Sequence, residues 1–318
     1  MTEAEDQDQP VGVRHRKQRL SQRTGVQASV ALAARASGAL ARVLGPRATG
    51  AVAGMVSRAA WRFVPESQLA LDNLRQAFPE KAETERRAIL RGAWDNLART
   101  VAELPLIRRM ALRDPENPLA GLSDRIDVVG AEWIEQLRDD GKTGIAFLAH
   151  LGNWEMLSPF IASFGARPAV LYRKPHNQRL VKELLAWRGD TAVLIPSGHG
   201  GARSVVAEMR SGNHFCMLVD QRLDSGPKVP FFGRPAPTNP IVARMARQFD
   251  CPVVGARSIR LPGGRFRVEV TPPLDLPRDA AGQIDVDGAT AMITAVVEGW
   301  VREHPDQWLW LHNRWGRA

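Results

Sequence analysis

The sequence predicts an α/β fold in which helices cover a largely parallel central sheet, preceded by an N-terminal helical segment. From about residue 125, short apolar segments alternate with segments of helical periodicity, a pattern typical of parallel sheets covered on both faces. Before residue 110 the apolar residues recur at helical spacing only. The chain has 318 residues, enough for a sizeable core.

The N-terminal region predicts a tail followed by a basic amphipathic helix. Residues 1–25 are polar and end in a basic patch, and we expect them to be disordered. Residues 26–62 are alanine-rich and helical in pattern; positions 9 to 60 contain nine Arg or Lys and no Asp or Glu. Such a segment fits an anionic membrane surface, and it also fits a solvated basic helix packed on the domain. Residues 63–318 then form the main domain.

The elements of the main domain follow in order. Two helices are expected between residues 66 and 110, broken by Pro79. Residues 262–264, Pro-Gly-Gly, predict that the last two strands form a hairpin added at one side of the sheet. Strands are expected in IDVV, GIAFLAH, PAVLYR, AVLIP, FCMLVDQ, PVVGARSIRL and RFRVEVTPPL, and helices over 154–164, 177–188, 200–211, IVARMARQF and 287–303.

Composition narrows the possible partners. The net charge of +9 and the pI near 10.4 favour an acidic partner: nucleic acid, anionic lipid or an acidic carrier. No nucleic-acid module is recognisable and the single tyrosine leaves little for base stacking, so we expect no nucleic-acid partner. The N-terminus is polar and acidic, and no apolar run reaches 18 residues. We therefore expect neither a signal peptide nor a spanning helix, and a protein that stays on the cytoplasmic side.

Neither a metal nor a cofactor is expected. The two cysteines, Cys216 and Cys251, lie in apolar contexts without metal spacing and are expected to be reduced core residues. The HExxH pattern is absent. His176, His199 and His214 lie in polar turns or at a strand start, where we expect surface residues, and GHGG at 198–201 is expected to be a turn before a helix.

Polar side chains follow three of the predicted strands. GIAFLA ends at His150, PAVLY ends at Arg173, and FCMLV ends at Asp220, which Gln221 and Arg222 follow. Because ligands gather at the carboxyl ends of parallel strands, we expect these three ends to converge at one edge of the sheet.

The stretch from His150 to Glu155 can be a catalytic pair. On one helix, five residues would separate the two side chains by about 140°. If His150 instead ends the strand, Asn153 can cap a helix that begins near Trp154, and Glu155 can fold back to hold the imidazole. This is the base and orienting group of a catalytic triad, with a bound hydroxyl as nucleophile. On spacing alone, we favour a satisfied core histidine beside a helix-start glutamate.

These residues resemble a known family. HLGNWE at 150–155 matches the histidine, four residues, then aspartate or glutamate of the lysophospholipid acyltransferase group. The resemblance is to its bacterial lipid A biosynthesis branch, the lauroyl and myristoyl transferases; it covers roughly 60–316 and implies a glycerol-phosphate acyltransferase-like fold. The further matching segments are DNLRQAFPE, DNLARTVAE, YRKPHN, MLVDQRLDSGPKVPFFGRPAPTNP and HPDQWLWLHNRW.

The resemblance implies transfer of a fatty acyl chain from a thioester, usually on acyl carrier protein, to a hydroxyl of a lipid A precursor. It implies that His150 is the general base and that Glu155 orients it. Arg173 would hold a phosphate or the oxyanion. Asp220 would be a second orienting group or a sugar ligand, and for both residues a structural ion pair is the alternative. Gln221 would also contact substrate.

Several residues keep two interpretations under the same resemblance. Arg222, Lys228 and Arg234 would bind lipid phosphates or lie in a solvated basic loop. Phe231 and Phe232 would line an acyl channel or, as we favour, pack in the core. Trp308 and Trp310 would be core or membrane-interface aromatics.

The resemblance implies a place at the cytoplasmic face of the inner membrane, peripheral or monotopic. Family members often begin with a hydrophobic anchor helix, whereas arginines interrupt this N-terminal segment. An alternative function keeps the reaction and changes the substrates: acyl-CoA as donor and another glycolipid, such as a phosphatidylinositol mannoside, as acceptor.

Overall fold

The computed structural model describes residues 24–107, 125–166, 168–172, 186, 191–198 and 200–316. Of the side chains before residue 43, it describes Ala41 only. Arg173, His176, His199 and almost all of the helix expected at 177–188 therefore lie outside the described residues.

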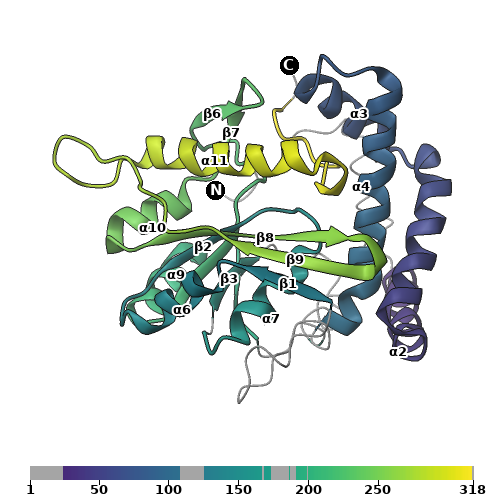
Figure 1. The fold of residues 1–318 in the computed structure, drawn as a ribbon, viewed down its shortest axis with the longest axis horizontal. Helices are drawn as coiled ribbons and strands as arrows, with labels where there is room; N and C mark the ends of the chain where they lie inside the picture. Colours follow the sequence, from purple (N-terminus) through teal and green to yellow (C-terminus); the bar gives the residue numbers. More distant parts are fainter. Residues whose placement is uncertain are drawn as a thin grey trace.

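A seven-stranded sheet forms the centre of the molecule, in the order β1-β9-β8-β2-β5-β3-β4 (Figure 1). The strands from β8 to β4 are mutually parallel, and β9 is antiparallel to β8 and parallel to β1. The α/β fold class predicted from the sequence is confirmed. The strands are β1 (Ile126–Val129), β2 (Ile145–Leu148), β3 (Pro168–Tyr172), β4 (Val193–Pro196), β5 (His214–Leu218), β8 (Val253–Leu261) and β9 (Arg265–Val270).

The β8–β9 hairpin turns through a short 3₁₀ helix, η4 (Pro262–Gly264), as the sequence predicted. The prediction that this hairpin lies at one side of the sheet is wrong, because β1 pairs with the outer edge of β9, Ile126 opposite Phe266. The hairpin thus lies between β1 and β2. Alternation of strands and helices along the chain does not reveal this order in space.

Helices cover both faces of the sheet, since successive strand side chains point to opposite faces. Ala146 and Leu148 face the cluster that includes α6 (Ala131–Asp139) and α7 (Leu157–Ala162). Ile145 and Phe147 face the other cluster, to which α9 (Gly201–Arg210), α10 (Ile241–Phe249) and α11 (Val286–Glu303) contribute. Figure 1 shows α10 and α11 on the side of the sheet opposite α6 and α7.

A second, two-stranded sheet follows β5, where the sequence predicted only a loop. Its strands are β6 (Lys228–Phe231) and β7 (Arg234–Pro237), and their prolines hide the strand pattern. Phe232 and Gly233 turn the chain with positive φ angles of 52° and 68°, as a tight hairpin requires. Phe231 and Phe232 are buried against Phe78, Trp308, Trp310 and Trp315, so the favoured packing interpretation holds.

The two helices expected on either side of Pro79 are present as α3 (Glu66–Ala77) and α4 (Glu83–Glu103), followed by a short 3₁₀ helix, η2 (Leu104–Leu106). In Figure 1, α4 runs across the end of the sheet to which β8 points. Because β2 is parallel to β8, α4 lies at the carboxyl ends of both strands. This placement brings α4 to the residues that follow β2.

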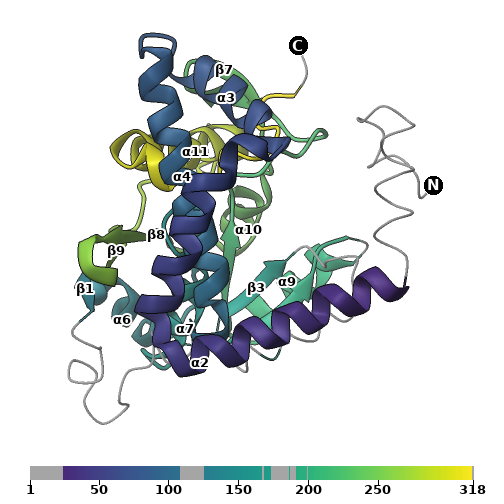
Figure 2. The same ribbon diagram turned by 90° about the vertical axis from the view of Figure 1, so that its right-hand side faces the viewer.

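The N-terminal helix α2 (Thr24–Ala60) is kinked. Gly45 has φ 74° and ψ 166°, which only glycine readily adopts, and Pro46 opens the second half with its fixed φ. Figure 2 shows the two halves at an angle, with the second upright beside α4. A side chain at Gly50 or Gly54 would collide with Glu103 or Asp95 of α4, so the glycine face is the one in contact. A short 3₁₀ helix, η1 (Trp61–Phe63), follows.

Candidate active site

His150 lies just beyond β2, in a loop that neighbouring segments hold. Its carbonyl accepts a hydrogen bond from the Leu309 amide at 3.1 Å, and its own amide donates to Asp220 Oδ2 at 2.8 Å. Gly152 has φ 58°, and a Cβ there would collide with the Ser258 carbonyl. The glycine is therefore required for the loop to pass so close to β8.

The imidazole contacts a buried carboxylate. Asp220 follows β5, the neighbour of β2, and the register places Leu148 opposite Leu218. His150 and Asp220 therefore occupy equivalent positions, and Nδ1 lies 2.7 Å from Asp220 Oδ1. Trp308 Nε1 donates to the other oxygen at 2.7 Å. The predicted convergence of strand ends holds for these two strands; the third, β3, pairs with β5 but its polar end lies outside the described residues.

The charges at this site favour one protonation pattern. Burial alone would raise the pKa of Asp220, but the charge of His150 and the hydrogen bonds from it hold that pKa well below its usual range. Burial lowers the pKa of the neighbouring His312 to about 4, so its ring is neutral near pH 7. An ionised Asp220 accepts the Nδ1 proton of His150, so in the uncharged form of the imidazole the lone pair lies at Nε2.

Nε2 is the atom available for proton transfer. The Gln221 amide nitrogen lies 3.3 Å from it, a long hydrogen bond that an incoming hydroxyl can replace. The Trp154 ring packs edge-on against the imidazole, with ring centres 5.2 Å apart. His150 is 9% exposed, so the base is largely shielded from water. The geometry suits a general base that acts on a bound hydroxyl.

Glu155 lies in the 3₁₀ turn η3 (Trp154–Met156) and is half-buried. Its predicted role as the group that orients His150 stays a prediction; Asp220 holds Nδ1. The prediction that Asn153 caps this helix through its side chain is wrong. The side-chain Nδ2 of Asn153 instead donates to Glu103 Oε2 at 2.8 Å, a charge-assisted hydrogen bond that directs this side chain toward α4.

The other predicted substrate contacts are less well placed. Arg222 pairs with Asp224, and its backbone bridges to Thr238. Arg234 donates to Gln76 and lies 5.9 Å from the Trp315 ring centre. Both guanidinium groups therefore already have partners in the protein. Lys228 is exposed at the start of β6.

The sequence did not predict that residues of α4 and of the C-terminal segment contact Asp220 and the His150 loop. Trp308 was expected to be core or interfacial; it is 1% exposed and also donates to Asp220. His312 lies 3.2 Å from the Asp220 carbonyl oxygen through Nε2. Asn96 and Thr100 of α4 donate to the Gly152 carbonyl. The segments DNLARTVAE and HPDQWLWLHNRW were noted, but nothing in them indicates contact with the His150 loop.

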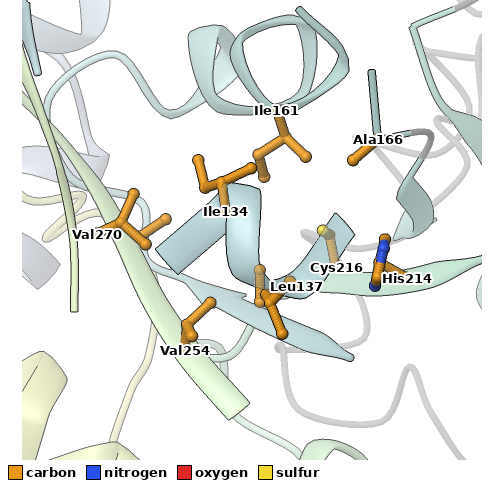
Figure 3. Close-up of a pocket in the computed structure, with 10 residues that line it drawn as sticks. Ile134, Leu137, Ile161, Ala166, His214, Cys216, Val254 and Val270 are labelled. Atoms are coloured by element: carbon orange, nitrogen blue, oxygen red, sulfur yellow. The ribbon is translucent and has the colours of Figure 1, made fainter. Parts of the chain in front are cut away.

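A small apolar pocket lies on the face of the sheet that α6 and α7 cover, between these helices and the strands (Figure 3). Ala146, His214 and Val254 contribute to it from the amino ends of their strands, opposite the end that carries His150. It is therefore separate from the candidate active site. His214 was expected at the surface but is half-buried, and burial lowers its pKa.

Both cysteines are buried and free, as expected. Burial raises the pKa of Cys216 and of Cys251 to about 12, so neither is a thiolate near neutral pH. Among the residues that the structure describes, no group of three or more His, Cys, Asp or Glu is arranged to hold a metal ion.

Comparisons with known proteins give a consistent picture. A family model described as "Bacterial lipid A biosynthesis acyltransferase" matches residues 19–317. The "Lipid A biosynthesis acyltransferase 2" of Shigella flexneri is 25% identical over 75% of this chain and 74% of its own. The "Lipid A biosynthesis myristoyltransferase" of Escherichia coli (strain K12) is 27% identical over 76% and 72%. The "Phosphatidylinositol mannoside acyltransferase" of Mycolicibacterium smegmatis is 29% identical over 43% and 52%.

Proposed function

The chain belongs to the bacterial lipid A biosynthesis acyltransferase family, and from this membership we propose that it transfers a fatty acyl chain from a thioester donor to a hydroxyl group of a lipid A precursor. The observation that carries the proposal is the family match over residues 19–317. That range includes the loop in which His150 meets Asp220.

The chemistry we propose uses His150 as general base. Nε2 takes the proton of the acceptor hydroxyl as its oxygen attacks the thioester carbonyl. When the tetrahedral intermediate collapses, the carbon–sulfur bond breaks and the imidazolium returns the proton to the leaving sulfur. Asp220 holds the ring orientation and stabilises the imidazolium through the 2.7 Å contact with Nδ1, as the aspartate of a catalytic triad does.

Other residues have proposed supporting roles. Glu155 adds negative charge at the start of the turn that follows the His150 loop and so favours the imidazolium. Arg173, immediately after β3, pairs with a phosphate of the substrate or with the oxyanion. Gln221 donates to Nε2 until the hydroxyl arrives, and then to the substrate. Arg222 and Arg234 could bind lipid phosphates only by exchanging their present partners.

The donor we propose is acyl carrier protein. Such carriers are acidic, and the net charge of +9 favours their approach through electrostatic steering. Acyl-CoA, which also carries negative charge, is the alternative donor. Neither donor requires a cofactor of the enzyme.

We propose that α2 seats the enzyme on the anionic inner membrane at its cytoplasmic face. In the described part of the chain, no helix is long and apolar enough to span a bilayer. Large apolar side chains are nevertheless exposed along α2, from just before its kink, and in η1, and we call them the α2 stripe: Leu44, Val52, Met55, Val56 and Phe63, which are 46 to 87% exposed.

The orientation of this helix supports a lipid partner. A helix on a water-soluble domain turns its apolar face inward. Here Gly50 and Gly54 face α4, whereas the apolar face is exposed. Arg47 and Arg62 are also exposed, where they can meet lipid phosphates. An apolar face flanked by cations is the pattern of helices that lie in the membrane interface.

The decisive test is His150→Ala in the purified full-length enzyme. We expect kcat to fall by about 10³-fold or more, with unchanged folding and unchanged binding to vesicles. Near wild-type turnover in the folded variant would contradict the proposed function. In cells, deletion of the gene should remove one acyl chain from lipid A, and mass spectrometry of the lipid would name chain and position together.

The similarity to a phosphatidylinositol mannoside acyltransferase supports one alternative acceptor, a phosphatidylinositol mannoside. The reaction and the base are the same, so His150→Ala does not separate the two. Incubation of the enzyme with each purified glycolipid and the same labelled acyl thioester does. Faster transfer to the mannoside would replace lipid A precursor as the acceptor and leave the mechanism intact.

A further inference from the structure

A buried polar cluster lies between α4 and the loop that carries His150. Its centre is an ion pair between Arg260, near the end of β8, and Glu103, at the end of α4. Arg260 Nη1 lies 2.7 Å from Glu103 Oε1, and Nη2 lies 2.9 Å from Oε2. The two side chains are only 11% and 5% exposed. Both carboxylate oxygens and both terminal guanidinium nitrogens are thus engaged.

This cluster extends to the catalytic loop. Glu103 Oε2 also accepts a hydrogen bond from the Asn153 amide at 2.8 Å. The Gly152 carbonyl accepts from Asn96 Nδ2 at 2.8 Å and from Thr100 Oγ1 at 3.1 Å. Arg260 Nε completes the connection by donating to Asn96 Oδ1 at 3.0 Å. The loop after His150 is therefore attached to α4 at two points: the side chain of Asn153 and the backbone of Gly152.

The C-terminal segment braces the same loop from another side. Gln307 exchanges two hydrogen bonds with the Arg260 backbone, at 2.8 and 2.9 Å. Its carbonyl accepts from the Gly152 amide at 3.1 Å and from Asn96 Nδ2 at 2.9 Å. Both polar atoms of the Gly152 peptide backbone consequently have partners that belong to this one cluster.

Stability alone explains this cluster poorly. A buried ion pair costs so much desolvation that well-packed apolar residues often serve stability equally well. Asn153 is fully buried, and among the residues that the structure describes its Oδ1 has no hydrogen-bond partner. An unmade hydrogen bond of this kind costs about 1–3 kcal/mol. A chain selected for stability only would avoid it.

The position of the loop does explain it. His150 must keep Nδ1 on Asp220 while Nε2 meets a hydroxyl, and a displacement of about 1 Å can lower a rate by roughly 10²-fold. Gly152 has positive φ and no side chain of its own to anchor the loop. The Gly152 backbone and the Asn153 side chain therefore anchor the loop to α4, in addition to the bonds that the His150 backbone makes with Leu309 and Asp220.

We propose that Glu103 and Arg260 are positioning residues, which hold the catalytic loop at the geometry that proton transfer requires. They act through Asn153 and Gly152 and do not touch substrate. The proposal rests on the proposed function, because it takes His150 to be the base. It adds α4 and β8 to the parts of the chain that determine turnover.

The test is Glu103→Gln, which keeps the size of the side chain and removes its charge. We expect kcat to fall roughly 30-fold, with KM changed by less than about 3-fold, in protein that remains folded by circular dichroism. The matched control is Glu269→Gln. It breaks the pair with Arg257 on the same strand β8, whose side chain is 10% exposed and whose partners are Glu269 on β9 and Glu303 at the end of α11. We expect the control to lose stability and to keep kcat.

A double-mutant cycle locates the effect. If Glu103 acts through the loop, Glu103→Gln combined with Asn153→Ala will lower kcat no further than the stronger single variant. Should Glu103→Gln fail to fold, Thr100→Val removes one donor to the Gly152 carbonyl at almost constant volume, and we expect about a 5-fold lower kcat.

Two results would overturn the inference: wild-type kcat in folded Glu103→Gln, or losses of kcat in Glu269→Gln as large as in Glu103→Gln. His150→Ala separates this failure from failure of the proposed function. If His150→Ala is inactive while Glu103→Gln is fully active, only the positioning role is wrong. If His150→Ala is active, the proposed mechanism itself is wrong.

Discussion

Two regions depart from the usual rule that apolar side chains are buried and charged ones exposed: the surroundings of the His150 loop, which we call the corner, and the outer face of α2. At the corner, ionised and polar groups are buried: Asp220 is 3% exposed and Glu103 4%. On α2, large apolar side chains are exposed, Phe63 at 87%. Buried charges need dense hydrogen bonding, and exposed apolar rows need a second non-aqueous phase. Each departure is consistent with a proposed function: chemistry in the first region and lipid contact in the second.

The largest effect that can test the corner is Asp220→Asn. The amide keeps the shape, but it removes the negative charge that stabilises the imidazolium, and it can hold the ring in the wrong tautomer. We expect kcat to fall by about 10³-fold, as measured with saturating donor. Glu155→Gln, which removes a charge from the neighbouring turn, should cost less.

The reverse order of the two kcat losses would contradict this assignment. If Glu155→Gln lowers kcat more than Asp220→Asn does, Glu155 is the principal orienting group, and the sequence-based assignment is the better one. Thermal unfolding of both variants is the control, because loss of the buried Asp220 charge also weakens its hydrogen bonds with Trp308 Nε1 and with the His150 amide.

The α2 stripe gives the next effect. Val52→Asp with Met55→Asp places charges on the exposed apolar face, where burial in lipid would become costly. We expect binding to vesicles of anionic phospholipid to weaken by about 100-fold, with kcat unchanged on detergent-dispersed substrate. Sedimentation with vesicles measures the first, and acyl transfer in detergent measures the second.

A valine elsewhere provides the matched control. Val129, at the end of β1, is 54% exposed and lies outside the stripe, so Val129→Asp should leave vesicle binding unchanged. Equal vesicle binding by the wild type and the double variant would mean that the stripe meets another protein surface or none. If Val129→Asp weakened vesicle binding as much as the double variant does, the added negative charge alone, and not the α2 stripe, would explain the loss.

The smallest expected effect concerns pH and His312. Its folded pKa of about 4 lies below the ordinary value of 6.5, so the unfolded chain binds the additional proton between these values. This contribution to stability is complete above about pH 6.5 and is lost as the pH falls toward 4. Because His312 as a residue keeps some contact with solvent, which screens its charge, we expect a loss of about 1–2 kcal/mol over that range.

Urea unfolding of the wild type and of His312→Gln at pH 7 and pH 4.5 measures this loss. The variant should lose less stability on acidification. Burial also lowers the pKa values of His214 and His304, so a residual slope will remain in the variant. An identical pH dependence in both proteins would contradict the burial of His312. The pKa of Asp220 is depressed below 3.8, so its contribution is lost only at lower pH.

Most of the fold was predictable because its signals are local. The alternation after residue 125 predicted every described strand of the main sheet, and the break at Pro79 predicted α3 and α4. The β6–β7 hairpin was missed because Pro230, Pro235 and Pro237 conceal its strands. Strand order was not predictable, since pairing of β1 with β9 joins residues 140 positions apart, such as Ile126 and Phe266.

The sequence by itself determined which residues we propose for the chemistry, because strand ends and family motifs can be read directly from it: His150 after one strand and Asp220 after another. Only the tertiary structure decided their partners. Asp220 holds Nδ1 because β2 and β5 are adjacent and in register. Asn153 turns from its own helix to Glu103 because α4 crosses the end of the sheet. Contacts between segments far apart in sequence arise from packing, which local pattern does not encode.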